Sequence, residues 1–276
     1  MLRSLYSGIS GLRAHQTMLD TTGNNIANVN TAGFKSSSTQ FQDTLSQMTQ
    51  GATTPQAGAG GGNPAQVGLG VQVAGISTNF GQGSTQSTGK ATDMMISGNG
   101  FFITQQGNTT TLTRAGAFDF DGLGQLTSPD GGIVQGWNLD ATGQTTGGLT
   151  GITLDPNLPN LESYTLGSDG TLTGNFSDGT QTPIARIALG TVANPAGLQK
   201  AGNSGYTVTA NSGQMQVVAA EQGGAGSIIG GALEMSNVDL SQEFTNLIVA
   251  QRGFQANARI ITTSDEVLQE LANLKR

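Results

Sequence analysis

The sequence lacks cysteine altogether and contains one histidine and one tryptophan among its 276 residues. Without cysteine, the chain can form neither a disulfide nor a thiolate metal site. The only histidine, His15, lies in a stretch with helical periodicity, where a lone histidine is usually a surface or packing residue. No serine has a histidine and an acid in a plausible arrangement for nucleophilic catalysis. We therefore expect no enzymatic activity, no catalytic or metal-binding residues and no cofactor.

Charged residues are also scarce, at 11% of the chain, and leave a net charge of −7. Acidic side chains outnumber basic ones between residues 36 and 238, and an acidic surface repels nucleic acids and anionic membranes. No apolar run approaches the roughly 18 residues that a membrane-spanning helix needs, and the first residues do not have the pattern of a cleavable signal peptide. Composition alone predicts a soluble, cytoplasmic protein without a nucleic-acid partner or membrane insertion.

Glycine is abundant, with 43 residues, and most of it lies in the middle of the chain. Helical periodicity at both ends and short β segments punctuated by turns between them predict an α+β fold. We expect long N- and C-terminal helices that form a coiled-coil-like antiparallel pair, and a central antiparallel all-β domain. The expected divisions are a helical domain at 1–30 and 237–276, an extended connecting region at 31–70 and 211–236, and an outer β domain at 71–210.

Apolar residues recur every seven positions in both terminal helices, which is the spacing of a narrow packing seam. Asp239 followed by Gln242 is an acidic variant of the capping box and marks the start of the last helix. Burying the two seams against each other covers both, but ordering two long thin helices costs entropy of similar size. We therefore expect the pair to be marginally stable in a free monomer and to be completed by neighbouring copies. The first helix contributes Leu5, Leu12, Leu19 and Ile26, with Leu2 and Ile9 in a second column. The last helix contributes Leu240, Leu247, Phe254, Ile261 and Leu268, with Phe244, Ala258 and Ala272 in a second column.

The middle of the chain alternates short apolar stretches with turn signals. Asn99-Gly100 and Asp169-Gly170 are typical of β-hairpin turns. The run from Asp119 to Gly122 begins like a calcium loop but lacks the third acidic ligand and the final glutamate, so we interpret it as a tight turn. Residues 51–64 have the composition of a flexible linker. Alternation predicts inward-facing side chains at Val71, Val73, Phe118, Phe120, Ile133, Trp137, Ile187, Leu189, Tyr206 and Val208.

A run rich in asparagine follows the first helix. It reads Gly23-Asn24-Asn25-Ile26-Ala27-Asn28-Val29-Asn30-Thr31-Ala32-Gly33-Phe34-Lys35. By itself such a run is a helix exit, in which side chains replace lost backbone hydrogen bonds.

The order of residues in this run resembles the N-terminal signature of bacterial flagellar axial proteins, the family of rod, hook and hook-associated subunits. The last helix carries stretches that resemble the matching C-terminal signature, and two stretches in the middle resemble the β-domain motifs of the family. These stretches are Asn237-Val238-Asp239-Leu240-Ser241, the run from Ile248 to Ala258, Asn99-Gly100-Phe101-Phe102 and the run from Thr113 to Phe118. The motifs occur in the order that the family has them.

The resemblance implies a structural subunit that polymerises helically, with the terminal helices as the inner wall of a tube and the β domain outside. The signature turn, formed by Asn24, Asn25, Ala27, Asn28, Asn30, Thr31, Gly33, Phe34 and Lys35, would orient the wall helices. Within the family, the residues of the signatures are most similar to those of hook subunits. The hook is the flexible coupling that transmits torque from motor to filament. The chain has no room for the second outer domain of many hook subunits, so it also resembles a distal rod subunit.

The resemblance also implies the partners and the location. The implied partners are further copies of the chain in a helical polymer, the distal rod protein, the hook cap and hook–filament junction proteins, and the flagellar export apparatus. The location would be the hook or basal body of the flagellum, extracellular after export without a cleaved signal peptide.

A monomeric carbohydrate- or surface-binding β module with a helical stalk is the alternative from a different functional class. A stalk needs only one burial face. Phe244, Ile248 and Leu271 lie off the seam and widen the apolar surface, which favours more than one neighbour and hence the polymer.

Overall fold

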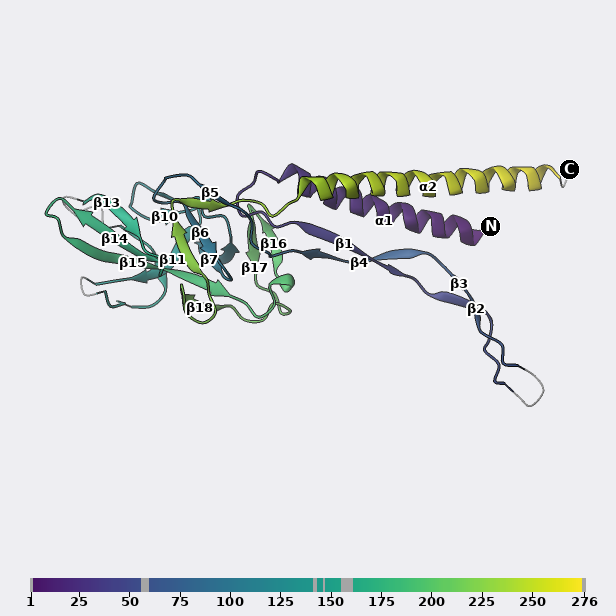
Figure 1. Ribbon diagram of the computed structural model, residues 1–276, viewed down its shortest axis with the longest axis horizontal. Coiled ribbons are helices and arrows are strands. Elements are labelled where there is room, and N and C mark those ends of the chain that lie inside the picture. The colour runs from purple at the N-terminus through teal and green to yellow at the C-terminus, as the bar shows by residue number, and fades with distance from the viewer. Residues whose placement is uncertain (1, 56–59, 141–142, 146, 155–160, 275–276) are drawn as a thin grey trace. The chain divides into compact units, whose positions relative to one another are not determined.

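The computed structural model describes the chain except for residues 1, 56–59, 141–142, 146, 155–160 and 275–276 (Figure 1). The chain divides into two compact units. The helical unit comprises Met1–Ala27, Ser37–Asn79 and Asp239–Arg276, and the β unit comprises Asn28–Ser36 and Phe80–Val238. The division differs from the expected one, because residues 37–79 group with the helices and residues 211–236 group with the β strands.

The helical unit contains two helices and a long β ribbon, which Figure 1 shows in purple, blue and yellow-green. β1 pairs with β4 and β2 pairs with β3, both antiparallel. The expected linker at 51–64 forms no strand in its described parts, although the N–H of Thr53 donates to the carbonyl of Gly62 at 3.0 Å. Its residues 56–59 lie outside the described residues. The elements are α1 (Leu2–Ala27), β1 (Ser37–Asp43), β2 (Ser46–Gln50), β3 (Ala65–Gly68), β4 (Val71–Thr78) and α2 (Leu240–Asn273).

The start of α2 confirms half of the predicted capping box. The Asp239 side chain accepts hydrogen bonds from the backbone N–H groups of Ser241 and Gln242, at 2.8 and 3.3 Å. Among the described residues, the reciprocal bond from the Asp239 N–H to the Gln242 side chain is not made, and Gln242 Nε2 donates to Asn246 Oδ1 at 3.1 Å. Neither helix is long and apolar enough, over the described residues, to cross a membrane.

The β unit is built on an antiparallel sheet of 12 strands among the described residues. Its main path runs β13-β14-β15-β11-β7-β8-β17-β16, with β9, β10, β12 and β18 attached at its sides. Two further pairs, β6 with β19 and β5 with β20, lie outside this sheet. The strands are β5 (Thr85–Ser87), β6 (Met94–Ser97), β7 (Phe101–Gln106), β8 (Thr109–Thr113), β9 (Asp119–Phe120), β10 (Leu126–Thr127), β11 (Ile133–Asn138), β12 (Thr150–Gly151), β13 (Leu161–Leu166), β14 (Thr171–Phe176), β15 (Gln181–Thr191), β16 (Gln199–Gly202), β17 (Gly205–Thr207), β18 (Gln216–Ala219), β19 (Ser227–Gly230) and β20 (Ala232–Glu234), with a short 3-10 helix at Pro195–Gly197.

One of the two predicted hairpin turns is confirmed and the other is wrong. Asp169-Gly170 joins β13 to β14, which pair with each other, and Gly170 has a φ of +80°. Asn99-Gly100 separates β6 from β7, but β6 pairs with the distant β19 instead. The predicted tight turn is present but begins at Asp121, because Asp119 and Phe120 form β9; Asp121 Oδ1 accepts hydrogen bonds from the N–H groups of Leu123 and Gln125 before β10.

The core of the β unit consists of two apolar clusters. The predicted inward-facing residues Phe118, Ile187, Leu189 and Tyr206 are buried, whereas Val208 is 42% exposed and therefore faces outward. The larger cluster contains Met94, Ile96, Phe102, Phe118, Leu126, Val134, Ile152, Ala185, Ile187, Leu189, Ala220 and Ile228. The smaller cluster contains Phe101, Ile103, Leu112, Ala188 and Tyr206. The remaining predicted residues, Val71, Val73, Phe120, Ile133 and Trp137, are partly buried.

Candidate assembly surfaces

The helices α1 and α2 contact each other through small residues. A Cβ added at Gly11 would lie 2.8 Å from the side-chain amide of Asn257, and one added at Gly253 would lie 2.5 Å from the His15 ring. Residues later in α1 therefore meet residues earlier in α2, so the helices run antiparallel. His15 has the packing role expected from the sequence, because its ring occupies the space that Gly253 leaves open.

Because the helices approach each other at glycines, the predicted seam residues are not all equally buried. The seam residues that are partly buried are Leu5, Leu12, Leu19, Ile26, Leu247, Ile261 and Leu268. Ile9 is 39% exposed, and Leu240 and Phe254 are 39% and 37% exposed. These three side chains are thus only partly covered, and Ile9 lines a hollow with Val71 and Val73 of β4. In the second column of the last helix, Phe244 and Ala272 are exposed and Ala258 is partly buried.

Large apolar side chains remain exposed on both parts of the helical unit. On α2, Ile248 is 57% exposed and Leu271 is 50% exposed. On the ribbon, Leu45 is 83% exposed and Met48 is 59% exposed. Contiguous exposed apolar residues are typical of surfaces that contact another molecule. The further members on α2 are Phe244, Val249, Ile260 and Val267, and those on the ribbon are Phe41, Val67, Leu69 and Ile76.

The signature turn begins in the helical unit with a buried asparagine. Asn25 is 1% exposed and uses both ends of its amide. Its Nδ2 donates to the Ser37 carbonyl at 2.8 Å and to Glu243 Oε1 at 3.0 Å, and its Oδ1 accepts from the Ser37 N–H at 3.0 Å. Asn25 thereby ties the end of α1 to β1 and to the first turn of α2. Asn24 and Ala27, on the same helical turn, are exposed.

The signature continues in the β unit as a tight turn. Thr31 closes it, because its hydroxyl donates to Asn28 Oδ1 and its N–H donates to the Asn28 carbonyl, both at 3.1 Å. Gly33 has a φ of +70° and donates its N–H to the Glu234 carbonyl at 2.7 Å. A Cβ at Gly33 would lie 2.4 Å from the backbone nitrogen of Ala115, so this position needs glycine for space as well as for conformation.

Two further signature residues lie on the outside of this turn. Asn30 is exposed, and the Phe34 ring has the Lys200 ammonium 5.2 Å from its centroid. A cation over an aromatic ring is attracted by the negative face of the ring.

The last signature residue, Lys35, is fully buried in an ionic cluster. Its Nζ lies 2.7 Å from Glu234 Oε1 and 2.8 Å from the Gly81 carbonyl. The other carboxylate oxygen, Glu234 Oε2, lies 3.3 Å from Nη1 of Arg114, and the N–H of Gly83 donates to Oε1. Burial lowers the pKa of Lys35 and of Arg114, while the contact with Glu234 acts in the opposite direction for both. Glu234 is thus the single carboxylate that two buried cations share.

Glu234 and Arg114 were not identified as partners of Lys35 from the sequence. Glu234 is 199 residues from Lys35, and nothing in its local pattern marks it as buried. Arg114 stands in a stretch that carries the family resemblance, which was the available signal, but the resemblance assigned no role to it.

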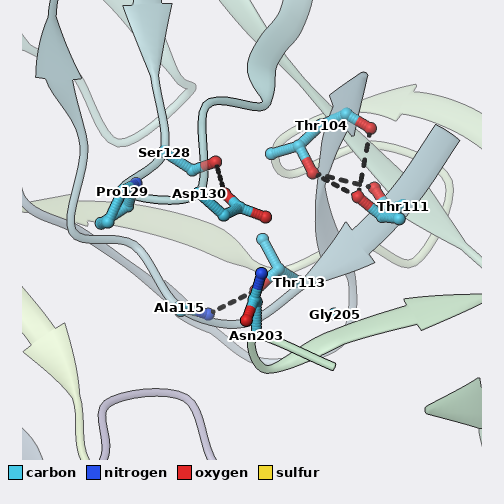
Figure 2. Close-up of a pocket in the computed structure, with 9 residues that line it drawn as sticks. All are labelled: Thr104, Thr111, Thr113, Ala115, Ser128, Pro129, Asp130, Asn203 and Gly205. Atoms are coloured by element: carbon cyan, nitrogen blue, oxygen red, sulfur yellow. Dashed lines mark hydrogen bonds between the residues drawn. The ribbon is translucent and has the colours of Figure 1, made fainter. Parts of the chain in front are cut away.

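A hollow on the β unit is lined by small side chains, three of them threonines, and by one carboxylate. The hollow has a volume of about 370 Å³. Figure 2 shows the threonines and Ser128 that line it, with Asp130 beside Ser128. Asp130 is the one ionisable side chain in the lining and accepts a hydrogen bond from Ser128. In the part of the chain that the structure describes, no cluster of histidine or acidic residues could hold a metal ion.

Three family profiles match this chain, in the order of the sequence motifs. Residues 5–35 match "Flagella basal body rod protein", residues 95–174 match "Flagellar hook protein FlgE/F/G D1 domain", and residues 229–274 match "Flagellar basal body rod FlgEFG protein C-terminal". The first contains most of α1 and the signature turn, and the last contains Glu234 and all of α2.

Individual relatives match over the whole chain. The flagellar basal-body rod protein FlgG of Bacillus subtilis (strain 168) is 47% identical over 279 residues, with all of both chains covered. The FlgG of Borreliella burgdorferi is 36% identical over 290 residues, with all of both chains covered. The flagellar hook protein FlgE of the same organism is 32% identical over 441 residues, again with all of both chains covered.

The chain belongs to the family of flagellar rod and hook axial proteins. Members of this family are structural components of the flagellum and not enzymes. The family resemblance drawn from the sequence motifs is therefore confirmed, and so is the location in the flagellum. Both rod proteins and hook proteins occur among the relatives, so membership of the family does not show whether the chain is a rod subunit or a hook subunit.

Proposed function

We propose that the chain is a structural subunit that polymerises helically into the distal rod of the flagellar basal body. The observation that carries this proposal is the match to Bacillus subtilis FlgG at 47% identity, with all of both chains covered. The alignment to the FlgE of Borreliella burgdorferi extends over 441 positions, many more than the 276 residues of this chain. That hook protein therefore contains sequence without a counterpart here.

The hook is the second candidate, and a specific observation favours it. The FlgE of Helicobacter mustelae is 52% identical over 143 residues, which cover 51% of this chain and 32% of that protein. The amino-acid sequence of the signature turn also favours the hook. A hook subunit of this size would be a compact one, because the chain lacks the sequence that a second outer domain requires.

We also propose that the helical unit forms the inner wall of the polymer. α1 and α2 would pair in a coiled-coil-like manner through Leu5, Leu12, Leu19, Ile26, Leu247, Ile261 and Leu268. The partly exposed Ile9, Leu240 and Phe254 would contact neighbouring copies. Burying a large aliphatic or aromatic side chain contributes about 1.5–3 kcal/mol, so a few such contacts per neighbour hold a polymer together. Contacts between different surfaces of identical subunits generate helical filaments.

The proposed partners follow from this position in the flagellum. Further copies of the chain would surround each subunit, the hook would adjoin the distal end of the polymer, and the export apparatus would deliver the chain. In the hook alternative, the hook cap and the hook–filament junction proteins would be neighbours instead.

The assembly surface can be tested with a matched pair of substitutions on α2. Ile248 is 57% exposed and Gln251 is exposed on the same helix, so neither change disturbs buried packing. Ile248→Asp should leave the circular dichroism of the monomer unchanged but prevent the formation of tubes in electron micrographs, because it places a charge in an apolar contact. Gln251→Asp should assemble normally. Normal tubes from Ile248→Asp would contradict the wall assignment.

The position along the flagellum needs a separate measurement. An antibody raised against residues 161–207 can be located by immunogold electron microscopy on isolated basal bodies with hooks attached. Gold on the rod supports the distal rod. Gold along the curved external segment supports the hook, and the absence of gold from both would contradict the family function.

A further inference from the structure

The ionic cluster around Glu234 contains one more cation than it has carboxylates. Lys35 and Arg114 are 0% and 4% exposed, and both contact the same carboxylate. Lys35 also has the Gly81 carbonyl at 2.8 Å. A buried charge without an opposite charge is costly, and proteins usually compensate it with a partner or with hydrogen bonds.

Arg114 is the member that remains incompletely compensated. Its Nη2 donates to the Gly98 carbonyl at 2.7 Å, and its Nη1 reaches the Ile96 carbonyl at 3.4 Å and Glu234 Oε2 at 3.3 Å. Its Nε is buried and has no hydrogen-bond partner. The guanidinium carbon lies 5.3 Å from the centroid of the Phe101 ring, which supplies a face but no acceptor.

Arg114 also lines a cavity of about 460 Å³ in the β unit. Arg114 is the one charged residue in the described lining, which also contains two phenylalanines, three amide side chains and several small or aliphatic residues. The amide residues are Asn99, Gln214 and Gln216. Amide N–H groups and a guanidinium are donors suited to an anionic oxygen. The cavity is larger than a lone carboxylate requires, and it has room for an acidic side chain together with its flanking backbone.

We propose that this cavity, the Arg114 cavity, binds a carboxylate carried by a neighbouring copy of the chain. The proposal rests on the proposed function, because a polymer places copies in permanent contact. The chain carries 18 acidic and 11 basic residues, so a neighbouring copy offers carboxylates in excess. A carboxylate that enters the cavity adds the second negative charge that the cluster of Lys35, Arg114 and Glu234 lacks.

The charge preference of the cavity can be tested by labelling a single cysteine. Gln216 lines the cavity and is exposed, and the natural chain has no cysteine, so Gln216→Cys provides a unique reactive group without disturbing the core. The thiol is modified with an anionic sulfonatoethyl, a neutral methyl or a cationic trimethylammonioethyl methanethiosulfonate. Gln199→Cys, on the exposed β16, receives the same three labels as the matched control.

The three labels should separate the unfolding temperatures of the Gln216→Cys protein. The anionic label should raise the midpoint by about 2–4 °C relative to the neutral label, and the cationic label should lower it, because each changes the charge beside Arg114. The Gln199→Cys protein should show the same midpoint with all three labels. Equal midpoints for the three labels at Gln216→Cys would overturn the proposal.

Assembly distinguishes a neighbouring copy from a free anion. Gln216→Cys with the neutral label should form tubes, whereas the anionic label should prevent them, because it fills the cavity within the same chain. Tubes from the anionically labelled protein would show that no neighbour uses the cavity and would overturn the proposal. A free anion would be the ligand instead if two results occurred together. The unfolding temperature of the wild type would be higher in sodium acetate or phosphate than in sodium chloride, and the anionically labelled protein would still form tubes. Failure of the unlabelled wild type to assemble would contradict the proposed function, while the midpoints would still report the charge preference.

Discussion

The packing of His15 against Gly253 gives a prediction whose sign depends on how close the helices are. A Cβ at Gly253 would lie 2.5 Å from Cε1 and Nε2 of the His15 ring. In an ordinary helix, Gly→Ala stabilises by about 1 kcal/mol, because alanine has the higher helix propensity. Here the added methyl group must displace the ring, and overpacking of that kind costs about 1–3 kcal/mol. Gly253→Ala should therefore lower the free energy of unfolding of the helical unit or leave it unchanged, despite the gain in propensity.

Gly23→Ala is the matched control on the partner helix. Gly23 also lies within a helix and is exposed, and a Cβ there would have no heavy atom within 4 Å. This substitution should stabilise the helical unit by about 0.5–1 kcal/mol, since only the propensity changes. The two glycines thus predict different outcomes for the same chemical change.

A double substitution isolates the contact itself. In a His15→Ala background the ring is gone, so Gly253→Ala should become stabilising by about 1 kcal/mol. The assay is urea unfolding followed by far-ultraviolet circular dichroism, together with hydrogen exchange of the α2 amides, which reports the stability of that helix separately. If Gly253→Ala stabilises the protein equally with and without His15, the two helices do not approach at this point and the reasoning fails.

Two further predictions concern the β unit. Glu234→Gln should destabilise this unit by about 3–5 kcal/mol in urea unfolding, because it leaves two buried cations without their shared carboxylate, whereas Glu221→Gln at an exposed turn should change it by less than about 0.5 kcal/mol. A small effect at Glu234 would show that the cluster is solvated. Burial raises the pKa of Tyr206 from 10.0 to about 12, although Arg114 opposes the shift. Because unfolding releases the phenol proton between these pH values, the free energy of unfolding should fall as the pH rises from 10 to 12. Tyr206→Phe should reduce that decline and remove a component near pH 12 from the ultraviolet titration, and an unchanged titration would contradict the shift.

Local patterns predicted the elements whose causes are local. The seven-residue spacing and Asp239 located both helices and the start of α2, and Asp169-Gly170 located a real hairpin. The same spacing could not show which side of each helix faces the partner. That orientation depends on Gly11 and Gly253, whose effect appears only when the opposing side chain is known.

Pairings between distant residues were beyond the reach of the sequence. Asn99-Gly100 has the composition of a hairpin turn, but the strand before it pairs with β19, so tertiary pairing overrode the local preference. Lys35 was recognised only as part of a signature, and its burial depends on a carboxylate 199 residues away. The sequence thus identified which segments matter in the candidate assembly surfaces but not which side chains meet there.

Both units close only when the two ends of the chain are present. In the helical unit, Asn25 binds Glu243 across 218 residues. In the β unit, Gly33 and Lys35 bind the backbone and the side chain of Glu234. Contacts between residues so distant in sequence close long loops, which costs conformational entropy. A chain whose C-terminal segment is held apart from its N-terminal segment therefore lacks these contacts in both units. We therefore expect both units to reach full stability only when the segment that contains Glu234 and Glu243 is in contact with the N-terminal segment.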